Sequence, residues 1–173
     1  LDGWARERGG PLVAVEQHER RGALVRAALG PDSSATVLVG DARRRPWGEQ
    51  RFDRVLVDAP CTGLGALRRR PEARWRRTPA DLASLGPIQR DLLAAALDAT
   101  TPGGVVAYVT CSPHVAETEL VVTDVVRRRG DVDVEDARAL LPEVADAGEG
   151  PFVQLWPHRH GTDAMFCAVL RRR

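Results

Sequence analysis

Two cysteines, Cys61 and Cys111, stand where thiols could do chemistry. Each follows a short apolar run rich in β-branched residues and lies in a polar turn, Asp-Ala-Pro-Cys-Thr-Gly for the first and Thr-Cys-Ser-Pro for the second. Such runs are typical of buried strands, and an open α/β sheet binds its ligands at the carboxyl ends of its strands. The sequence therefore predicts two thiols in one cleft. A lone cysteine near a strand end is more often a small buried hydrophobe, but two at equivalent strand ends favour the cleft. Cys167 lies inside the last apolar strand, and we expect it in the core.

Acids end three of the predicted strands: Glu16, Asp41 and Asp58. In a doubly wound sheet, one such acid can accept hydrogen bonds from both ribose hydroxyls, and another can reach an adenine amine. Together they indicate a site for a nucleoside-bearing cofactor. Taken singly, a strand-end acid is as often a helix cap or a loop residue. Gly63 and Gly65 follow the wrong strand for a cofactor fingerprint, and we interpret them as letting the loop pass close to a ligand.

Strands and helices alternate along the chain, as is typical of an α/β fold. The end of the chain reads as an antiparallel hairpin. We therefore predict a doubly wound, Rossmann-like sheet that is mostly parallel, with an antiparallel C-terminal hairpin, in a single domain over residues 1–173. The expected strands are 12–16, 36–39, 52–58, 105–110, 132–134, 152–156 and 164–170. The expected helices are 1–8, 19–29, 78–100 and 116–129, and a turn is expected at 102–104.

The composition excludes several classes of function. All 25 basic residues are arginine, which excludes lysine Schiff-base chemistry and supplies planar groups suited to phosphate, while the formal net charge is only +1. Three cysteines without a CxxC pair argue against a disulfide framework and a structural metal site. Neither a membrane-length apolar run nor an export signal is found, so we expect a cytoplasmic protein with no membrane partner.

Several motifs agree in order and spacing with one known family. The chain resembles the bacterial Sun/Fmu-type ribosomal RNA cytosine-5 methyltransferases, part of the wider family of RNA 5-methylcytosine enzymes. The motifs that carry the resemblance are residues 58–63, 70–75, 102–104, 110–113 with Glu117 and Glu119, 155–158 and 161–163.

The resemblance implies divided roles for the two cysteines. Cys111 would be the nucleophile, because carbon 5 of cytosine accepts a methyl group only after a thiolate has added to carbon 6. Cys61 would assist release of the product. An unperturbed thiol is mostly protonated at neutral pH, so we expect the site to favour the Cys111 thiolate through helix N-terminal amides after Ser112.

The resemblance also implies a cofactor, S-adenosylmethionine, and an RNA partner with no metal. Small-subunit ribosomal RNA is the leading substrate and transfer RNA the next. The arginine-rich loop could contact phosphates and stack on a base, although a solvated arginine run with Trp75 packed in the core is an equal alternative. The implied cofactor residues are Glu16 at the ribose, Asp41 at the adenine side and Asp58 shared with the target base. The implied RNA-binding residues are Arg70, Arg74, Trp75 and His158.

The family's first cofactor motif, a strand with a Pro-Gly-Gly-Lys loop, would lie before Leu1 and is absent from the sequence. We therefore expect a sheet without its first strand. Two alternatives stay open. One is a DNA cytosine-5 methyltransferase, in which the proline-cysteine motif itself holds the nucleophile. The other is a non-catalytic remnant that binds RNA through its arginines.

Overall fold

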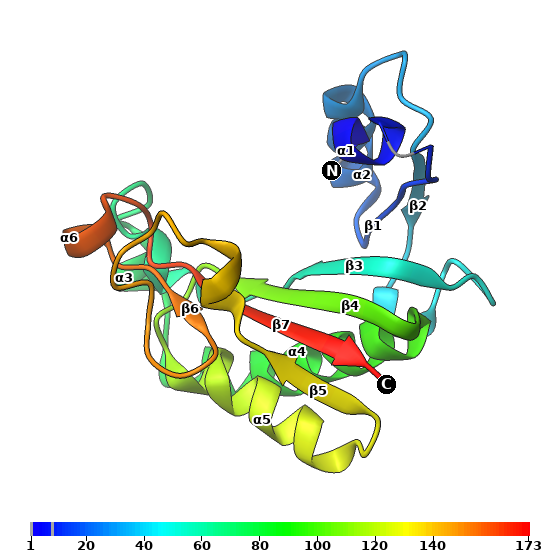
Figure 1. The fold of residues 1–173 in the computed structure, drawn as a ribbon. Helices are drawn as coiled ribbons and strands as arrows, with labels where there is room; N and C mark the ends of the chain where they lie inside the picture. Colours follow the sequence, from blue (N-terminus) through cyan, green and yellow to red (C-terminus); the bar gives the residue numbers. More distant parts are fainter. Residues whose placement is uncertain (1, 8) are drawn as a thin grey trace. The chain divides into compact units, whose positions relative to one another are not determined.

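The structure is a computed structural model and describes residues 2–7 and 9–173. Leu1 and Arg8, the ends of the first predicted helix, lie outside the described residues. The chain forms two compact units, Leu1–Gln50 and Arg51–Arg173, which are coloured blue and cyan to red in Figure 1. The single domain expected over residues 1–173 stays a prediction.

The first unit is a βαβ arrangement. Strands β1 and β2 pair in parallel, with Val13 opposite Thr36 and Glu16 opposite Val39. A helix joins them because parallel neighbours need a long crossover. The elements of this unit are α1 (Asp2–Glu7), β1 (Val13–Glu16), α2 (Glu19–Leu29), β2 (Thr36–Val39) and the short 3₁₀ helix η1 (Ala42–Arg44).

The second unit is a mixed five-stranded sheet in the order β3-β4-β7-β5, with β6 also paired to β7. Strands β3 and β4 are parallel, whereas β7 is antiparallel to β4, β5 and β6. The α/β fold with antiparallel C-terminal strands is therefore confirmed. The strands are β3 (Phe52–Asp58), β4 (Thr100–Thr110), β5 (Val132–Glu135), β6 (Val153–Gln154) and β7 (Phe166–Arg172). The helices are η2 (Leu64–Ala66), α3 (Ala73–Arg76), α4 (Pro79–Ala99), η3 (Val115–Glu117), α5 (Glu119–Arg128), η4 (Ala137–Leu140) and α6 (Pro157–His160).

Strand β4 begins five residues earlier than predicted. The turn expected at 102–104 is an irregularity inside the strand, because the register shifts so that Phe52 faces Thr100 while Arg54 faces Val105. Helix α4 begins where its capping residues predicted, with Pro79 first and the Thr78 amide donating to Asp81 at 2.7 Å.

The sheet of the second unit has apolar packing on both faces. Helices α4 and α5 cover one face (Figure 1), where Tyr108 and Phe166 are buried. Alternation along β7 turns Val169 and Cys167 to the other face, where they pack against the segment that follows β5. The core position expected for Cys167 is therefore confirmed.

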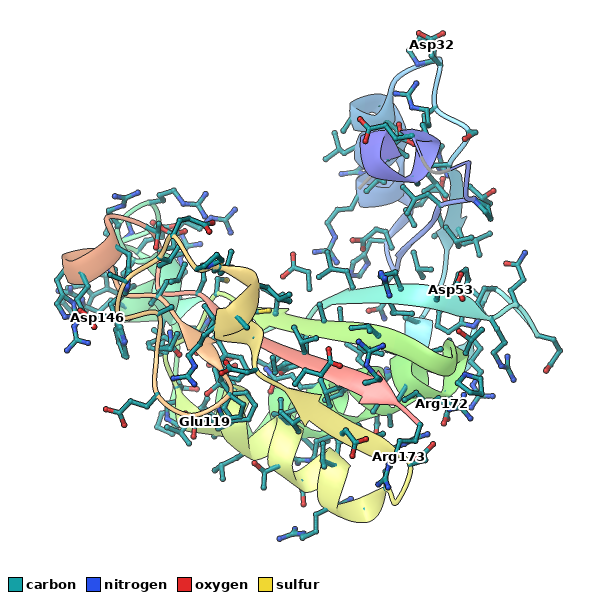
Figure 2. All side chains as sticks on the ribbon, in the orientation of Figure 1. Asp32, Asp53, Glu119, Asp146, Arg172 and Arg173 are labelled. Atoms are coloured by element: carbon teal, nitrogen blue, oxygen red, sulfur yellow. The ribbon has the colours of Figure 1, made fainter. Side chains whose placement is uncertain are left out.

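The end of β7 is tied to the end of α4. Arg172, labelled in Figure 2, donates from one guanidinium nitrogen to the Thr100 carbonyl at 2.6 Å. A cation at a helix C-terminus satisfies carbonyls that have no partner within the helix. This contact fixes the strand to the helix that covers it.

Candidate functional site

The carboxyl ends of β3 and β4 bring the two predicted thiols together. These strands are parallel neighbours with Asp58 opposite Val109, so the loops that follow them leave the sheet side by side. The Sγ atoms of Cys61 and Cys111 lie 3.4 Å apart. Both side chains are partly buried and both are free thiols.

The two thiols differ in acidity. The hydrogen bond from Cys61 lowers the pKa of Cys111 to about 7. The same hydrogen bond, together with burial, raises the pKa of Cys61. These opposite pKa shifts favour Cys61 as the donor and Cys111 as the thiolate, which is the nucleophilic form.

The expected role of helix amides in this acidity is wrong. The first helical element after Ser112 is η3 (Val115–Glu117), a 3₁₀ helix of only three residues. The largest cause of the lowered pKa of Cys111 is the neighbouring thiol, which is distant in sequence.

A glycine lets three loops cross beside the thiols. The Gly65 amide donates to the Cys111 carbonyl at 2.9 Å, and the Gly65 carbonyl accepts from the Ala164 amide at 2.9 Å. A Cβ at Gly65 would overlap the Ala164 carbonyl oxygen and lie 2.7 Å from that of Cys111. Gly65 therefore allows close approach of the protein's own backbone, whereas we expected it to allow close approach to a ligand. Gly63 takes the left-handed conformation, with φ of 72°.

The three predicted cofactor acids differ in their surroundings. Asp58 ends β3, and partial burial raises the pKa of its carboxyl although the side chain stays accessible to water. Within residues 2–7 and 9–173 its carboxylate has no hydrogen-bond partner, which suits an acid that receives a ligand's N–H. Glu16 uses only Oε1, which accepts from the His18 amide at 2.9 Å and from Arg21 Nε at 3.0 Å. Its Oε2 has no partner among those same residues, so a hydroxyl donor could still bind there.

Asp41 acts as a cap. It accepts from the Arg43 amide at 3.0 Å and from both ends of the Arg43 guanidinium. The side-chain hydrogen bond from Arg43 holds the pKa of Asp41 below its usual value. Asp41 fits the alternative of an ordinary cap, and an adenine amine would have to compete with Arg43 for it.

The predicted RNA-binding residues lie on two adjoining exposed segments. Trp75 is 82% exposed, so its packing in the core is wrong. Arg70, Arg74 and His158 are exposed as well, and in the described part of the chain neither of the two guanidinium groups has an ion-pair or hydrogen-bond partner. The segments are joined by Arg68, which donates to the Gly161 carbonyl at 2.6 Å.

Asp163 joins the same two segments. Arg69 donates to its Oδ2 from Nε at 2.7 Å, and this hydrogen bond lowers the pKa of Asp163. The other oxygen, Oδ1, is buried and lacks a partner within the residues that the structure describes.

A buried polar cluster behind the thiols was missed by the sequence reasoning. Glu117 and Gln89 are each 0% exposed, and Gln89 Nε2 donates to Glu117 Oε1 at 3.2 Å. Gln89 could have been found, because it replaces an apolar residue on the helical stripe that Leu93 and Leu97 continue. Glu117 belongs with the motif at 110–113, but nothing in that motif shows that it is buried, because two of its partners, Thr62 and Gln89, are distant in sequence.

Across the described ranges, no three His, Cys, Asp or Glu side chains are grouped to hold a metal ion. Over the same residues, every helix is too short or too polar to cross a membrane.

We expect alkylation by iodoacetamide to select Cys111. Its lowered pKa, about 7, makes about half of it thiolate at neutral pH. Its rate should rise as the pH rises through that value, and it should exceed the rate of Cys167, whose pKa is raised by burial. Peptide mass spectrometry across pH gives each rate. In the urea-unfolded chain, all three cysteines should react with one profile near pKa ~8.5. Faster labelling of Cys61 in the folded chain would contradict the assignment.

Solved structures with the same fold place the chain among Rossmann-like methyltransferases. It is 29% identical to the structure described as "Crystal Structure of PH0851", with a TM-score of 0.86 over 94% of this chain and 37% of that one. It is 26% identical to NSun6 from Pyrococcus horikoshii with SFG, with a TM-score of 0.80 over 94% of this chain and 41% of that one.

A family model described as 16S rRNA methyltransferase RsmB/F matches residues 6–171, and the chain belongs to that family. It is 69% identical over 122 residues to the putative methyltransferase Rv1407 of Mycobacterium tuberculosis, covering 70% of this chain and 26% of that protein. It is 34% identical to the ribosomal RNA small subunit methyltransferase B of Vibrio cholerae, over 94% of this chain and 36% of that protein. The chain thus spans only about a quarter to a third of the length of these relatives.

Proposed function

We propose that this chain carries the catalytic thiols of an S-adenosylmethionine-dependent methyltransferase that modifies carbon 5 of a cytosine in ribosomal RNA. The observation that carries the proposal is the thiol pair at 3.4 Å, in which Cys111 has a pKa of about 7. A thiolate is required because carbon 5 is not nucleophilic until a sulfur has added to carbon 6. Membership of the RsmB/F family supports ribosomal RNA as the substrate class.

Each thiol has one role in this reaction. The Cys111 thiolate adds to carbon 6, and the electron pair of the 5,6 double bond becomes available at carbon 5. S-Adenosylmethionine, when bound, would supply an electrophilic methyl group there, with its neutral thioether as the leaving group. The proton of carbon 5 then leaves to a base, and the carbon 6–sulfur bond breaks to return the Cys111 thiolate.

Cys61 is suited to accept the carbon 5 proton. The largest cause of its raised pKa is the hydrogen bond that it makes to Cys111. Once Cys111 is bonded to carbon, that thiolate no longer exists, so the pKa of Cys61 falls toward the ordinary value for a thiol. Cys61 can therefore lose its own proton to water, and so become a base for the carbon 5 proton, only after the nucleophile has reacted.

The remaining roles concern binding. Asp58, with its free carboxylate, would accept hydrogen bonds from the target base and the cofactor. Glu16 is assigned to the ribose and Asp41 to the adenine side. S-Adenosylmethionine as the cofactor is supported by the relative whose structure is described with SFG, an analogue of it. A ribosomal RNA substrate would put the activity in the cytoplasm.

The test is methyl transfer by the complete product of the gene, beside this chain alone. Each protein is titrated with S-adenosylmethionine by calorimetry and then incubated with labelled cofactor and unmodified small-subunit ribosomal RNA, transfer RNA or DNA. We expect 5-methylcytidine in ribosomal RNA. Cofactor binding with methyl transfer only to transfer RNA or to DNA would overturn the substrate. Failure of both proteins to bind the cofactor would overturn the catalytic proposal in favour of a non-catalytic RNA-binding remnant.

We expect Trp75→Ala to weaken RNA binding by about 5- to 150-fold, because stacking of one base on an aromatic ring contributes ~1–3 kcal/mol. Filter binding at fixed salt measures it. Trp75→Phe should keep most of the affinity, and Leu140→Ala, an exposed apolar change in η4, should keep all of it. Folding should be unaffected since Trp75 is 82% exposed. Equal RNA affinity of the alanine and phenylalanine variants would show that the ring of Trp75 does not stack on the RNA.

A further inference from the structure

One buried acid in the second unit is not used by the reaction described above. Glu117, in η3, is 0% exposed. Its carboxylate accepts from the Thr62 amide at 2.7 Å, the Thr62 hydroxyl at 2.6 Å, the Ser112 hydroxyl at 2.6 Å and Gln89 Nε2 at 3.2 Å. Two of the four partners are N–H groups, which can only donate, and the two hydroxyls are placed to donate as well, so both carboxylate oxygens serve as acceptors.

Three of the four donors belong to the two loops that carry the thiols. Thr62 directly follows Cys61, and Ser112 directly follows Cys111. A single side chain therefore holds the residue next to each sulfur. Gln89 extends the arrangement, because its Nε2 also donates to the carbonyl of Pro60, the residue before Cys61, at 2.9 Å.

The backbone of Glu117 is fixed as well. The hydroxyl of Tyr108, a fully buried residue of β4, donates to the Glu117 carbonyl oxygen at 2.9 Å. Helix α4 through Gln89 and strand β4 through Tyr108 thus both hold Glu117 in place. A residue held from two sides can transmit a fixed geometry to the loops that it binds.

The charge of Glu117 acts unequally on the two sulfurs. It adds to the rise in the pKa of Cys61, after the larger effects of the Cys111 hydrogen bond and burial. The carboxylates that oppose ionisation of Cys111 are others, and the hydrogen bond from Cys61 outweighs them. The charged groups that face Cys111 are the carboxylates of Asp58 and Asp163 and the guanidinium of Arg69. The titratable groups that face Cys61 are the carboxylate of Glu117 and the hydroxyl of Tyr108.

We propose that Glu117 is a positioning residue that keeps the two thiols in hydrogen-bond contact by holding the residue that follows each of them. It draws the two loops together at Thr62 and Ser112, and its negative charge adds to the larger effects that raise the pKa of Cys61. Its part in methyl transfer rests on the function proposed above, whereas its effect on the thiols does not.

The test is Glu117→Gln in the complete gene product, read out by the alkylation rate of each cysteine across pH. The amide has nearly the same shape, but its NH₂ group faces donors and cannot accept from them. We expect the alkylation profile of Cys111 to move up toward ~8.5, with its rate at neutral pH falling about tenfold, and Cys61 to begin to react. Glu119→Gln is the matched control, because Glu119 is an exposed acid two residues further on, labelled in Figure 2.

A folded Glu117→Gln protein with the wild-type rates and selectivity would overturn the proposal. If that variant fails to fold, Ser112→Ala decides instead, since it removes one donor and leaves the carboxylate. We then expect a smaller shift in the same direction, and an unchanged profile would overturn the proposal. Because no RNA or cofactor is present, this outcome is separate from methyl transfer. A shift in a protein that methylates nothing would uphold the positioning role and reject the proposed function.

Discussion

Replacing Cys111 by alanine is expected to abolish the covalent adduct between the complete gene product and its RNA, whereas Cys61→Ala is expected to make that adduct accumulate. Without the Cys111 sulfur, no bond to carbon 6 can form, and methyl transfer should fall by at least about 10³-fold, as for removal of other catalytic nucleophiles. Without Cys61, the bond to carbon 6 still forms, but the base that lies 3.4 Å from the nucleophile is missing. The carbon 5 proton is then removed slowly, and the adduct persists. Denaturing gels of labelled RNA measure the adduct.

The pH dependence of adduct formation by Cys61→Ala tests whether Cys61 lowers the pKa of Cys111. Cys61 is the largest cause of the lowered pKa of Cys111, so its removal should make the adduct form more slowly at neutral pH than near pH ~9. Cys167→Ala is the matched control, because that thiol packs on the opposite face of the sheet, and it should leave both adduct and turnover unchanged. The reverse pattern, with the adduct lost in Cys61→Ala and kept in Cys111→Ala, would indicate the DNA-type assignment of the nucleophile.

Gly65→Ala is expected to be the most destabilising single-methyl change in the second unit. The added Cβ would overlap the Ala164 carbonyl oxygen and lie 2.7 Å from that of Cys111. The backbones of Ala164 and Cys111 are both hydrogen-bonded to Gly65. Moving them away to make room for the Cβ would therefore break these hydrogen bonds. We expect a cost of about 3 kcal/mol in the free energy of unfolding, the upper part of the range for overpacking.

Urea unfolding of Gly65→Ala measures this cost. The matched control is Gly130→Ala, because a Cβ at Gly130 would meet nothing within 4 Å. The control should unfold within about 0.5 kcal/mol of the wild type. A Gly65→Ala variant as stable as the control would mean that the loops do not cross at this glycine. Where the variant does fold, separation of the loops should also reduce the preference of iodoacetamide for Cys111.

The sequence was most informative where a signal is local. Runs of β-branched residues located β2 and β3 at their observed bounds, and the cap at Thr78 located the start of α4. Strand β4 was predicted five residues too short, because Pro102 and two glycines read as a turn. Pairing with β3 overrides that local preference by absorbing these residues in a register shift.

The residues of the site could be predicted from the sequence, whereas their acidity and burial could not. The positions of Cys61 and Cys111 at the ends of two strands predicted that the two thiols lie together. The cause of the Cys111 acidity could not be read locally, because it is a contact between residues 50 apart in sequence. Glu117 was visible only as part of a motif, and its burial depends on donors from two loops and a helix. Interactions that need several distant segments at once leave no periodic trace in a sequence.

The position of β7 has a consequence for how the second unit folds during synthesis. This strand is the last of the chain in sequence, yet it lies between β4 and β5 and also pairs with β6. Strands β5 and β6 pair only with β7 within the described residues, so they have no sheet to join until Phe166–Arg172 have left the ribosome. The helices can form earlier, because their contacts are local. Closure of the sheet is then a long-range step, and any pause before Phe166–Arg172 would leave the edge of β4 open to other chains.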